Sequence, residues 1–468
     1  MTFGALLVHG YHPWAEDAEL YLPSVEKLLN PRLFPFNAQF FQSHAHLTIF
    51  PNVIDASVRI SHLPLPYALF LWHLISIFLL LFACWELAGR CFTAPVATYG
   101  AVALVAALLT LPVAGTALYI MDQYLNPRNL TAFLAILSIA KVLDRKYVLA
   151  ALLLLFGVAI HPLMFAFAIS FCLLLCGMQN LKPLWSAGCL LPLGILDPPT
   201  AAYHQAVMAH SYFYLTQWHW YEWLGAIGPV FIFLWLTQIA RSRKMSNLEL
   251  LCRTLVFYQT AFVIIGVVLT VPARFESIAR LQPMRSLYLS YLLLVLFSGG
   301  LLAQFVLKNR WWRWIVIFLP LCGGMFYAQR ALFPASAHIE WPDSEPRNLW
   351  VQAFEWVRGN TPSDAIFALD PYYMHISGED ENGFRAIAQR SRLADGLTDS
   401  GAVSMFPPLA EEWLAQAQAQ AAWRQFGAAD FRRLHAKYGL NWVVLQQSQM
   451  ADLQCPYQNR AVKVCRVD

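Results

Sequence analysis

The chain has 468 residues, of which 58% are hydrophobic and only 13% charged, and its net charge is +4. Soluble domains carry roughly 25% charged residues, so this composition excludes an ordinary cytosolic enzyme and a disordered chain. The small net charge also argues against a nucleic-acid partner. About a tenth of residues 1–330 are charged, against about a fifth of residues 338–468. The sequence therefore predicts a mainly α protein: a polytopic helical membrane domain over 1–330 and a small soluble α/β domain over 338–468.

Apolar runs predict about ten membrane spans and a truncated helix over residues 1–9. The runs cover residues 64–88, 94–119, 129–143, 147–160, 162–178, 185–199, 222–240, 248–270, 286–307 and 311–330. A span needs about 20 apolar residues, and four of these runs are shorter. Because Pro162 disfavours a helix at His161, residues 147–178 form either two short helices or one long kinked helix.

Lys and Arg in the short loops predict the orientation of the spans. Eleven of them fall on one side of the predicted bundle, and four on the side that also holds residues 10–63. The side with eleven is expected to be the cytoplasm. An even number of spans then places the loop 10–63 and the C-terminal domain together on the outer side.

The C-terminal domain is predicted to contain helices at 346–359, 407–424 and 428–437, and strands at 365–370, 440–446 and 461–467. The acidic run 378–381 is interpreted as a solvated turn. Cys455 and Cys465 flank a short segment on the outer side, where disulfides persist. They form either a disulfide, which we favour, or two free thiols.

An acidic cluster follows the N-terminal apolar residues. It comprises Glu16, Asp17 and Glu19. Clustered like charges raise the pKa of one carboxyl, which suits a proton acceptor, and carboxylates also bind metals. The alternative is that these acids lie at the start of an amphipathic helix over 15–29 and complement its dipole.

Arginines form a second candidate site on the outer side. Arg274, Arg280 and Arg285 lie between two predicted spans, and Arg128 lies near Asp122. Arginine suits bidentate contact with phosphate, and a lipid-linked phosphate would explain basic residues on this side. The alternative is snorkelling to the interface or pairing with nearby acids.

A third candidate is the aromatic segment 200–221, which contains His204, His210 and His219. Aromatic rings stack on sugars, but they also form interfacial belts, and we favour the belt. The histidines lack zinc-like spacing. His161, at the predicted helix break, is interpreted first as a structural hydrogen-bond partner. The sequence predicts neither a metal site nor a cofactor.

Several segments resemble a family of uncharacterised bacterial multi-pass membrane proteins, a domain of unknown function. They are AEDAELYLP, LPVAGTALYIMD, HPLMFAF, RLQPMRSL, AFEWVRGNTPSDAIFALDP and GEDENGFRAIAQRS. The overall plan resembles the C-type (GT-C fold) glycosyltransferases. That resemblance implies a polyprenyl-phosphate-linked sugar and an acid in the first outer loop, where Asp17 lies, with Glu16 as second candidate. It also implies a bacterial inner-membrane protein with a periplasmic C-terminal domain.

The favoured hypothesis is a glycosyltransferase at the outer face of the membrane, with membrane lipid as a partner. Its catalytic residues would be Asp17 and Glu16, and its substrate and phosphate pocket would contain Arg128, Arg280, Arg285, Asp122 and His161. The alternative is a non-catalytic membrane protein that binds lipid-linked glycan or scaffolds envelope assembly. A transporter is disfavoured, because the predicted helix interiors hold few ionisable residues.

Overall fold

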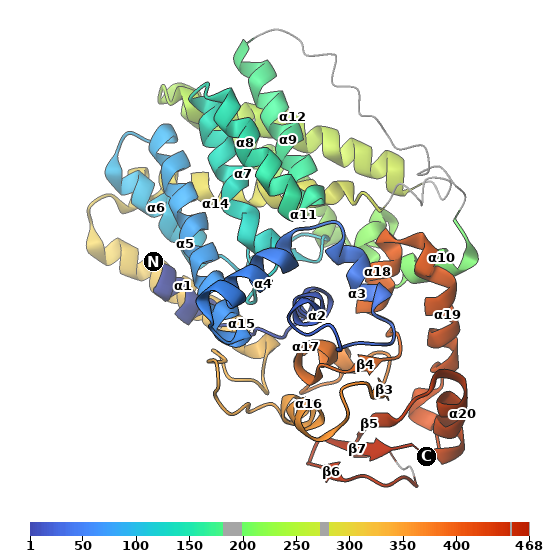
Figure 1. The fold of residues 1–468 in the computed structure, drawn as a ribbon. Helices are drawn as coiled ribbons and strands as arrows, with labels where there is room; N and C mark the ends of the chain where they lie inside the picture. Colours follow the sequence, from blue (N-terminus) through green and yellow to red (C-terminus); the bar gives the residue numbers. More distant parts are fainter. Residues whose placement is uncertain (181–198, 272–279, 450–451, 468) are drawn as a thin grey trace.

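The protein is described by a computed structural model over residues 1–180, 199–271, 280–449 and 452–467. It is mainly helical, with a helix bundle and a small C-terminal sheet domain gathered at one end of it (Figure 1). Six of the described helices are long and apolar enough to cross a membrane. They are α5 (Leu65–Cys91), α9 (Pro162–Asn180), α11 (Trp220–Ser242), α12 (Ser246–Thr270), α14 (Leu287–Leu302), which η6 (Ala303–Leu307) extends, and α15 (Trp311–Leu332).

Three shorter helices complete the described bundle: α6 (Pro95–Ala107), α7 (Pro127–Leu143) and α8 (Tyr147–Ile160). At 1.5 Å per residue, α8 is about 21 Å long, shorter than the roughly 30 Å hydrocarbon core of a bilayer. The predicted break at His161 is confirmed, because α8 ends there and α9 begins at Pro162. The total of about ten spans stays a prediction, and residues 185–198 of one predicted span lie outside the described residues.

The predicted helix over 94–119 is wrong beyond Ala107. Residues 112–119 form a hairpin of two short antiparallel strands, β1 (Pro112–Val113) and β2 (Leu118–Tyr119). Pro112 has no amide hydrogen for a helix and disfavours helical backbone at Leu111. An apolar run shows burial in protein or lipid, but it does not show that the chain continues as a helix.

The basic loops predicted to share one side lie together in the structure. Arg90, at the end of α5, donates from Nη2 to Oδ2 of Asp144, after α7, at 2.8 Å. Asn247, at the start of α12, donates to the Arg90 carbonyl at 2.9 Å. The Arg243 guanidinium lies 4.8 Å from the centre of the Phe305 ring. One end of the bundle therefore carries these cations.

Short helices near the N-terminus lie between the other end of the bundle and the sheet domain (Figure 1). They are α2 (Ala18–Leu29), α3 (Gln39–Ala45) and α4 (Phe50–Ser61), whereas α1 (Thr2–His9) packs against α5, α6 and α15 of the bundle. The predicted amphipathic helix over 15–29 is confirmed as α2. Leu22 and Val25 are buried on it, in a cluster that includes Ala386 of the sheet domain. Thr48 joins this layer to the bundle by donating to the Ile160 carbonyl at 2.5 Å.

The sheet has five strands in the order β4-β3-β5-β7-β6. These are β3 (Ile366–Ala368), β4 (Ser391–Arg392), β5 (Trp442–Gln446), β6 (Tyr457–Gln458) and β7 (Val462–Arg466). β3 is parallel to β4 and β5, whereas β7 is antiparallel to β5 and β6. The three predicted strands match β3, β5 and β7. Cys455, just before β6, and Cys465, on β7, form a disulfide, as favoured from the sequence.

The C-terminal domain also contains the helices α16 (Leu349–Asn360), α17 (Phe384–Ala388), α18 (Thr398–Met405), α19 (Ala410–Ala419) and α20 (Ala428–Tyr438). α18 packs against α2 and α3. α16 and α20 match predicted helices. The predicted helix over 407–424 is wrong beyond Ala419, where α19 ends and only a single 3₁₀ turn follows, at Trp423–Gln425.

The predicted solvated turn at 378–381 is wrong. Glu379 is fully buried and Asp380 is 6% exposed. Asp380 accepts hydrogen bonds from the backbone N–H groups of Ala335 and Ser336, at 2.8 and 2.7 Å. Buried polar groups need such partners, and sequence polarity does not show whether the fold provides them.

The predicted interfacial belt at 200–221 is only partly exposed. Trp220 is 77% exposed, but Tyr203, on α10 (Ala201–Met208), and Phe213 are buried. Both lie in one hydrophobic cluster with Val403 and Trp413 of the sheet domain. This part of the segment therefore joins the sheet domain to the bundle.

Candidate functional site

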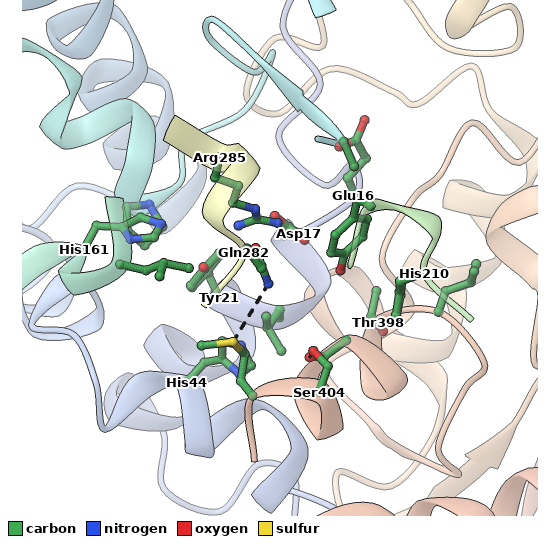
Figure 2. A pocket seen from close by; sticks show the side chains of 18 of the residues that line it. Glu16, Asp17, Tyr21, His44, His161, His210, Gln282, Arg285, Thr398 and Ser404 are labelled. Atoms are coloured by element: carbon green, nitrogen blue, oxygen red, sulfur yellow. Dashed lines mark hydrogen bonds between the residues drawn. The ribbon is translucent and has the colours of Figure 1, made fainter. Parts of the chain in front are cut away.

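A pocket of about 290 Å³, lined by both polar and apolar side chains, lies where the bundle, the α2–α3 layer and the sheet domain meet, and we call it the polar pocket. Figure 2 shows that its side chains come from distant parts of the chain. Those with polar groups include Glu16, Asp17, Tyr21, His44, His161, His210, Tyr212, Gln282, Arg285, Thr398 and Ser404. With Glu381 and His375, which also line it, the pocket combines three carboxyls, one guanidinium, four imidazoles and several neutral hydrogen-bonding groups.

Asp17 immediately precedes α2, but its side chain makes no capping hydrogen bond to that helix. It points instead toward Arg285, which lies in the 3₁₀ turn Pro283–Ser286 before α14 (Figure 2). Burial raises the pKa of the Asp17 carboxyl, and the charges of Arg128 and Arg285 partly oppose that rise. A carboxyl with a raised pKa is a better proton acceptor near neutral pH.

Arg285 is a buried cation with an incomplete set of partners. Its Nε has no hydrogen-bond partner, and its guanidinium lies 5.5 Å from the centre of the Tyr212 ring. Within the described part of the chain, no carboxylate forms an ion pair with it at 4.0 Å or less. Arg128, by contrast, is ion-paired with Asp122. The positive charge of Arg285 is therefore available to an anion in the pocket.

Arg285 and Arg128 also line a small apolar groove of only about 20 Å³ between α7, α9 and α14. The walls of this groove are mostly hydrocarbon, from Ala132, Ala135, Met164, Phe165, Phe167, Leu289 and Leu292. Arg285 is thus shared by the polar pocket and by a groove among the helices of the bundle.

Glu16 is held in the pocket wall by the sheet domain. Its backbone N–H donates to the Glu381 carbonyl at 2.8 Å, and the Gly383 N–H donates to the Trp14 carbonyl at 2.8 Å. Glu16 and Glu381 both adopt left-handed backbone, with φ of 49° and 57°, a strained conformation that is common at functional sites. Burial, and then the nearby Glu381 charge, raise the pKa of Glu16 well above its ordinary value.

Behind the pocket, Glu19 joins α2 to the sheet domain through a fully buried ion network. Its Oε1 accepts from Nε of Arg392 at 2.8 Å, and its Oε2 accepts from the Arg385 backbone N–H at 2.7 Å. The two arginines also bind Asp399, at distances from 2.8 to 3.2 Å. Gly383 permits this approach, because a Cβ there would lie 2.8 Å from Glu19 Oε2.

Glu19→Ala is expected to lower the free energy of unfolding by about 3–5 kcal/mol, because it leaves buried arginines without their charge partner. Chemical denaturation of the purified chain in detergent measures the loss. Glu411→Ala, an exposed acid on α19, is the control and should change stability by at most about 0.5 kcal/mol. Equal stability of the two variants would contradict the proposed importance of the network.

The structure brings together most of the predicted site residues. Asp17, Glu16, His161 and Arg285 line the polar pocket, and the Arg128–Asp122 ion pair lies near it, with Arg128 in the apolar groove. Arg280 is half-buried and does not line either cavity. Arg274 lies outside the described residues. Among the residues that are described, no group of three or more His, Cys, Asp or Glu side chains is arranged to hold a metal ion.

Sequence analysis missed several pocket residues, among them Tyr21, His44, Tyr212, Gln282 and Glu381. None belongs to a motif with recognisable spacing. They converge because four separate segments, 16–48, 210–212, 282–285 and 374–405, meet at the end of the bundle. His210 and Tyr212 were within a predicted aromatic segment, but its aromatic content favoured an interfacial belt.

The six long apolar helices of the described bundle indicate a multi-pass membrane protein. Its pocket lies between one end of this bundle and the sheet domain. No protein-family model and no curated protein matches the chain. Among solved structures, it is similar to the Archaeoglobus fulgidus oligosaccharyltransferase in the apo form, with 11% identity and a TM-score of 0.47. The match covers 95% of this chain and 68% of that one.

Two further solved structures are similar in fold. The archaeal oligosaccharyltransferase AglB, in complex with an inhibitory peptide and a dolichol-phosphate, has 12% identity and a TM-score of 0.45, covering 95% of this chain and 68% of that one. The mycobacterial arabinofuranosyltransferase AftD has 14% identity and a TM-score of 0.44, and the match covers 99% of this chain and 39% of that one.

Proposed function

We propose that the chain is a glycosyltransferase that moves a sugar from a polyprenyl-phosphate donor to an acceptor hydroxyl in the polar pocket. The observation that supports this most directly is the position of Arg285. Its unneutralised guanidinium lies between a polar cavity that contains Asp17 and an apolar groove among the bundle helices. A donor with a polar sugar and an anionic phosphate suits the pocket and the charge of Arg285 at its wall.

In the proposed reaction, the bond between sugar C1 and the donor phosphate oxygen breaks, and a bond from C1 to the acceptor oxygen forms. Asp17 accepts the proton of the acceptor hydroxyl. Polyprenyl phosphate leaves with the bonding electron pair, and Arg285 stabilises the negative charge that develops on it. Arg128 contributes less net charge, because Asp122 neutralises it.

Glu16 has a different role in this proposal. Burial and Glu381 raise the pKa of Glu16 well above its ordinary value, so Glu16 keeps its proton over a wider pH range than an exposed glutamate does. A neutral carboxyl donates a hydrogen bond but is a poor base. We therefore assign proton acceptance to Asp17, and to Glu16 a hydrogen bond to a sugar hydroxyl or to Glu381.

The direct test uses the full chain in lipid vesicles with radiolabelled polyprenyl-phosphate-linked sugars and an envelope glycan extract as acceptor. We expect labelled glycan and an equal amount of released polyprenyl phosphate. A parallel experiment measures thermal unfolding with polyprenyl phosphate in the vesicles, because a ligand that binds only the folded state stabilises it. Stabilisation without transfer from any donor would favour the non-catalytic alternative and overturn the proposed activity.

The proposed location is the bacterial inner membrane, with the sheet domain and the polar pocket on the extracytoplasmic side. The basic loops around Arg90 and Arg243 support this orientation, because cytoplasmic loops carry an excess of Lys and Arg. In intact spheroplasts, a membrane-impermeant label should reach a cysteine placed at exposed position Arg432 of α20. It should not reach one placed at Lys146.

A further inference from the structure

A further groove, of about 450 Å³, lies in the sheet domain and is separate from both the polar pocket and the apolar groove. Its volume is within the range of about 300–1,000 Å³ that is usual for small-molecule sites. It is lined by Asp370 and Tyr372, which follow β3, and by Gly396, which follows β4. β3 and β4 are neighbouring parallel strands, and α/β sheets bind ligands in the crevice at the carboxyl ends of such strands.

Tyr372 gives this groove a flat aromatic platform. Its ring packs directly on Gly396, where a Cβ would lie 2.6 Å from a ring carbon. The Gly396 N–H donates to the Pro371 carbonyl at 2.9 Å, which holds the two segments together. Even so, 54% of Tyr372 is exposed. The ring is therefore fixed on one side and open to a ligand on the other.

The polar groups around the platform are mostly neutral amides. Gln205, Gln418 and Gln425 are exposed at the groove, and an amide both donates and accepts hydrogen bonds. Asp370 is 7% exposed and accepts from the Tyr372 N–H at 2.9 Å. The only cation among the lining residues is Arg424, whose side chain is 82% exposed and whose Nε lies 3.8 Å from Asp370.

This combination fits a neutral, hydroxyl-rich ligand. The CH face of a sugar ring stacks on an exposed tyrosine, and its hydroxyls pair with amides and a carboxylate. A strongly anionic ligand would meet Asp370 and only one exposed arginine. A purely apolar ligand would cover the exposed glutamine amides without giving them hydrogen-bond partners.

The groove and the polar pocket are connected through the chain. Gly396 lines the groove, and Leu397 and Thr398, which follow it, line the polar pocket. Tyr372 lines the groove, and Met374, two residues further on, lines the pocket. A chain-like ligand in the groove is therefore held by the same two segments that form one wall of the pocket.

We propose that this groove binds a neutral glycan chain, with the Tyr372 ring as its stacking platform. That the glycan is the acceptor of the transfer rests on the function proposed above. The binding itself does not, because it requires neither the donor nor Asp17.

The test measures binding without any donor. The labelled full chain in detergent is applied to an array of neutral glucan, mannan, galactan and arabinan oligosaccharides, together with anionic glycans and peptides. We expect binding to one or more neutral glycans. Tyr372→Ala should weaken that binding about tenfold or more, whereas Tyr372→Phe, which keeps the ring, should bind within about twofold of the natural chain.

Binding to no neutral glycan, binding only to anionic glycans or peptides, or unchanged affinity in Tyr372→Ala would each overturn the proposal. Because Tyr372 is largely exposed, its replacement leaves the fold intact, and a thermal unfolding curve verifies this. Glycan binding by a chain that transfers no sugar would refute the transferase and leave the glycan site standing. Sugar transfer by a chain that binds no glycan in this assay would refute the glycan site and leave the transferase activity supported.

Discussion

Asp17→Asn is expected to lower the initial rate of sugar transfer by about 10²–10⁴-fold, the usual contribution of a positioned general base. Asparagine has nearly the same size as aspartate, so the packing before α2 is kept. The amide cannot accept the proton of the acceptor hydroxyl. The loss should therefore appear in the rate at saturating donor, measured with the radiolabelled donor in vesicles.

Asp55→Asn is the matched control for this variant. Asp55 lies on α4, which packs against α2, and pairs with Arg59 at 2.8 Å outside the pocket. Its replacement should leave transfer unchanged. Glycan analysis of cells that carry Asp17→Asn extends the test, because the glycan product should be lost at normal protein levels. Natural rates in the purified Asp17→Asn variant would refute the assignment of Asp17 as base.

Arg285→Gln is expected to lower transfer by about 10²–10³-fold, as does loss of one group that stabilises a developing anion. It should also change the pH dependence. Transfer requires ionised Asp17 and so rises with pH through the pKa of that carboxyl. The charge of Arg285 lowers this pKa. Without it the pKa rises, and the acid limb of the rate profile moves to higher pH.

Two variants make this result specific. Arg285→Lys keeps the charge but not the bidentate geometry, so its acid limb should stay near that of the natural chain even though its rate falls. Arg280→Gln removes an arginine only five positions away that does not line the pocket, and it should keep both rate and profile. An acid limb that stays in place in Arg285→Gln would contradict the coupling of Arg285 to Asp17.

Local rules predicted the parts of this fold that local forces determine. The break at His161 follows from the effect of Pro162 on the residue before it. β5 and β7 are short runs of β-branched and apolar residues, and they form strands at the predicted positions. Asp17 was identified because acids were clustered directly after an apolar segment.

The rest depended on contacts between distant segments. The residues next to Glu19 in the sequence are those expected around an exposed acid on a helix. Glu19 is buried in an ion network only because the fold brings it into contact with Arg385, 366 residues further along the chain. Arg280 and Arg285 share one short segment and one side-chain type. Only the 3₁₀ turn Pro283–Ser286 places Arg285 in the pocket. Sequence pattern and composition predict neither the burial of Glu19 nor the position of Arg285 in the pocket.

The joining of Glu16 and Glu19 to residues 381–392 has a consequence for the synthesis of the chain. A ribosome that adds about 5–20 residues per second needs about 20–70 s to proceed from Glu19 to Arg385. During that time α2 has none of its ion-network partners, and the pocket lacks the wall formed by residues 374–405. Nascent chains therefore carry Asp17 without a working cavity around it. Any chemistry of the pocket begins only after residue 405, the last that lines it, has been made.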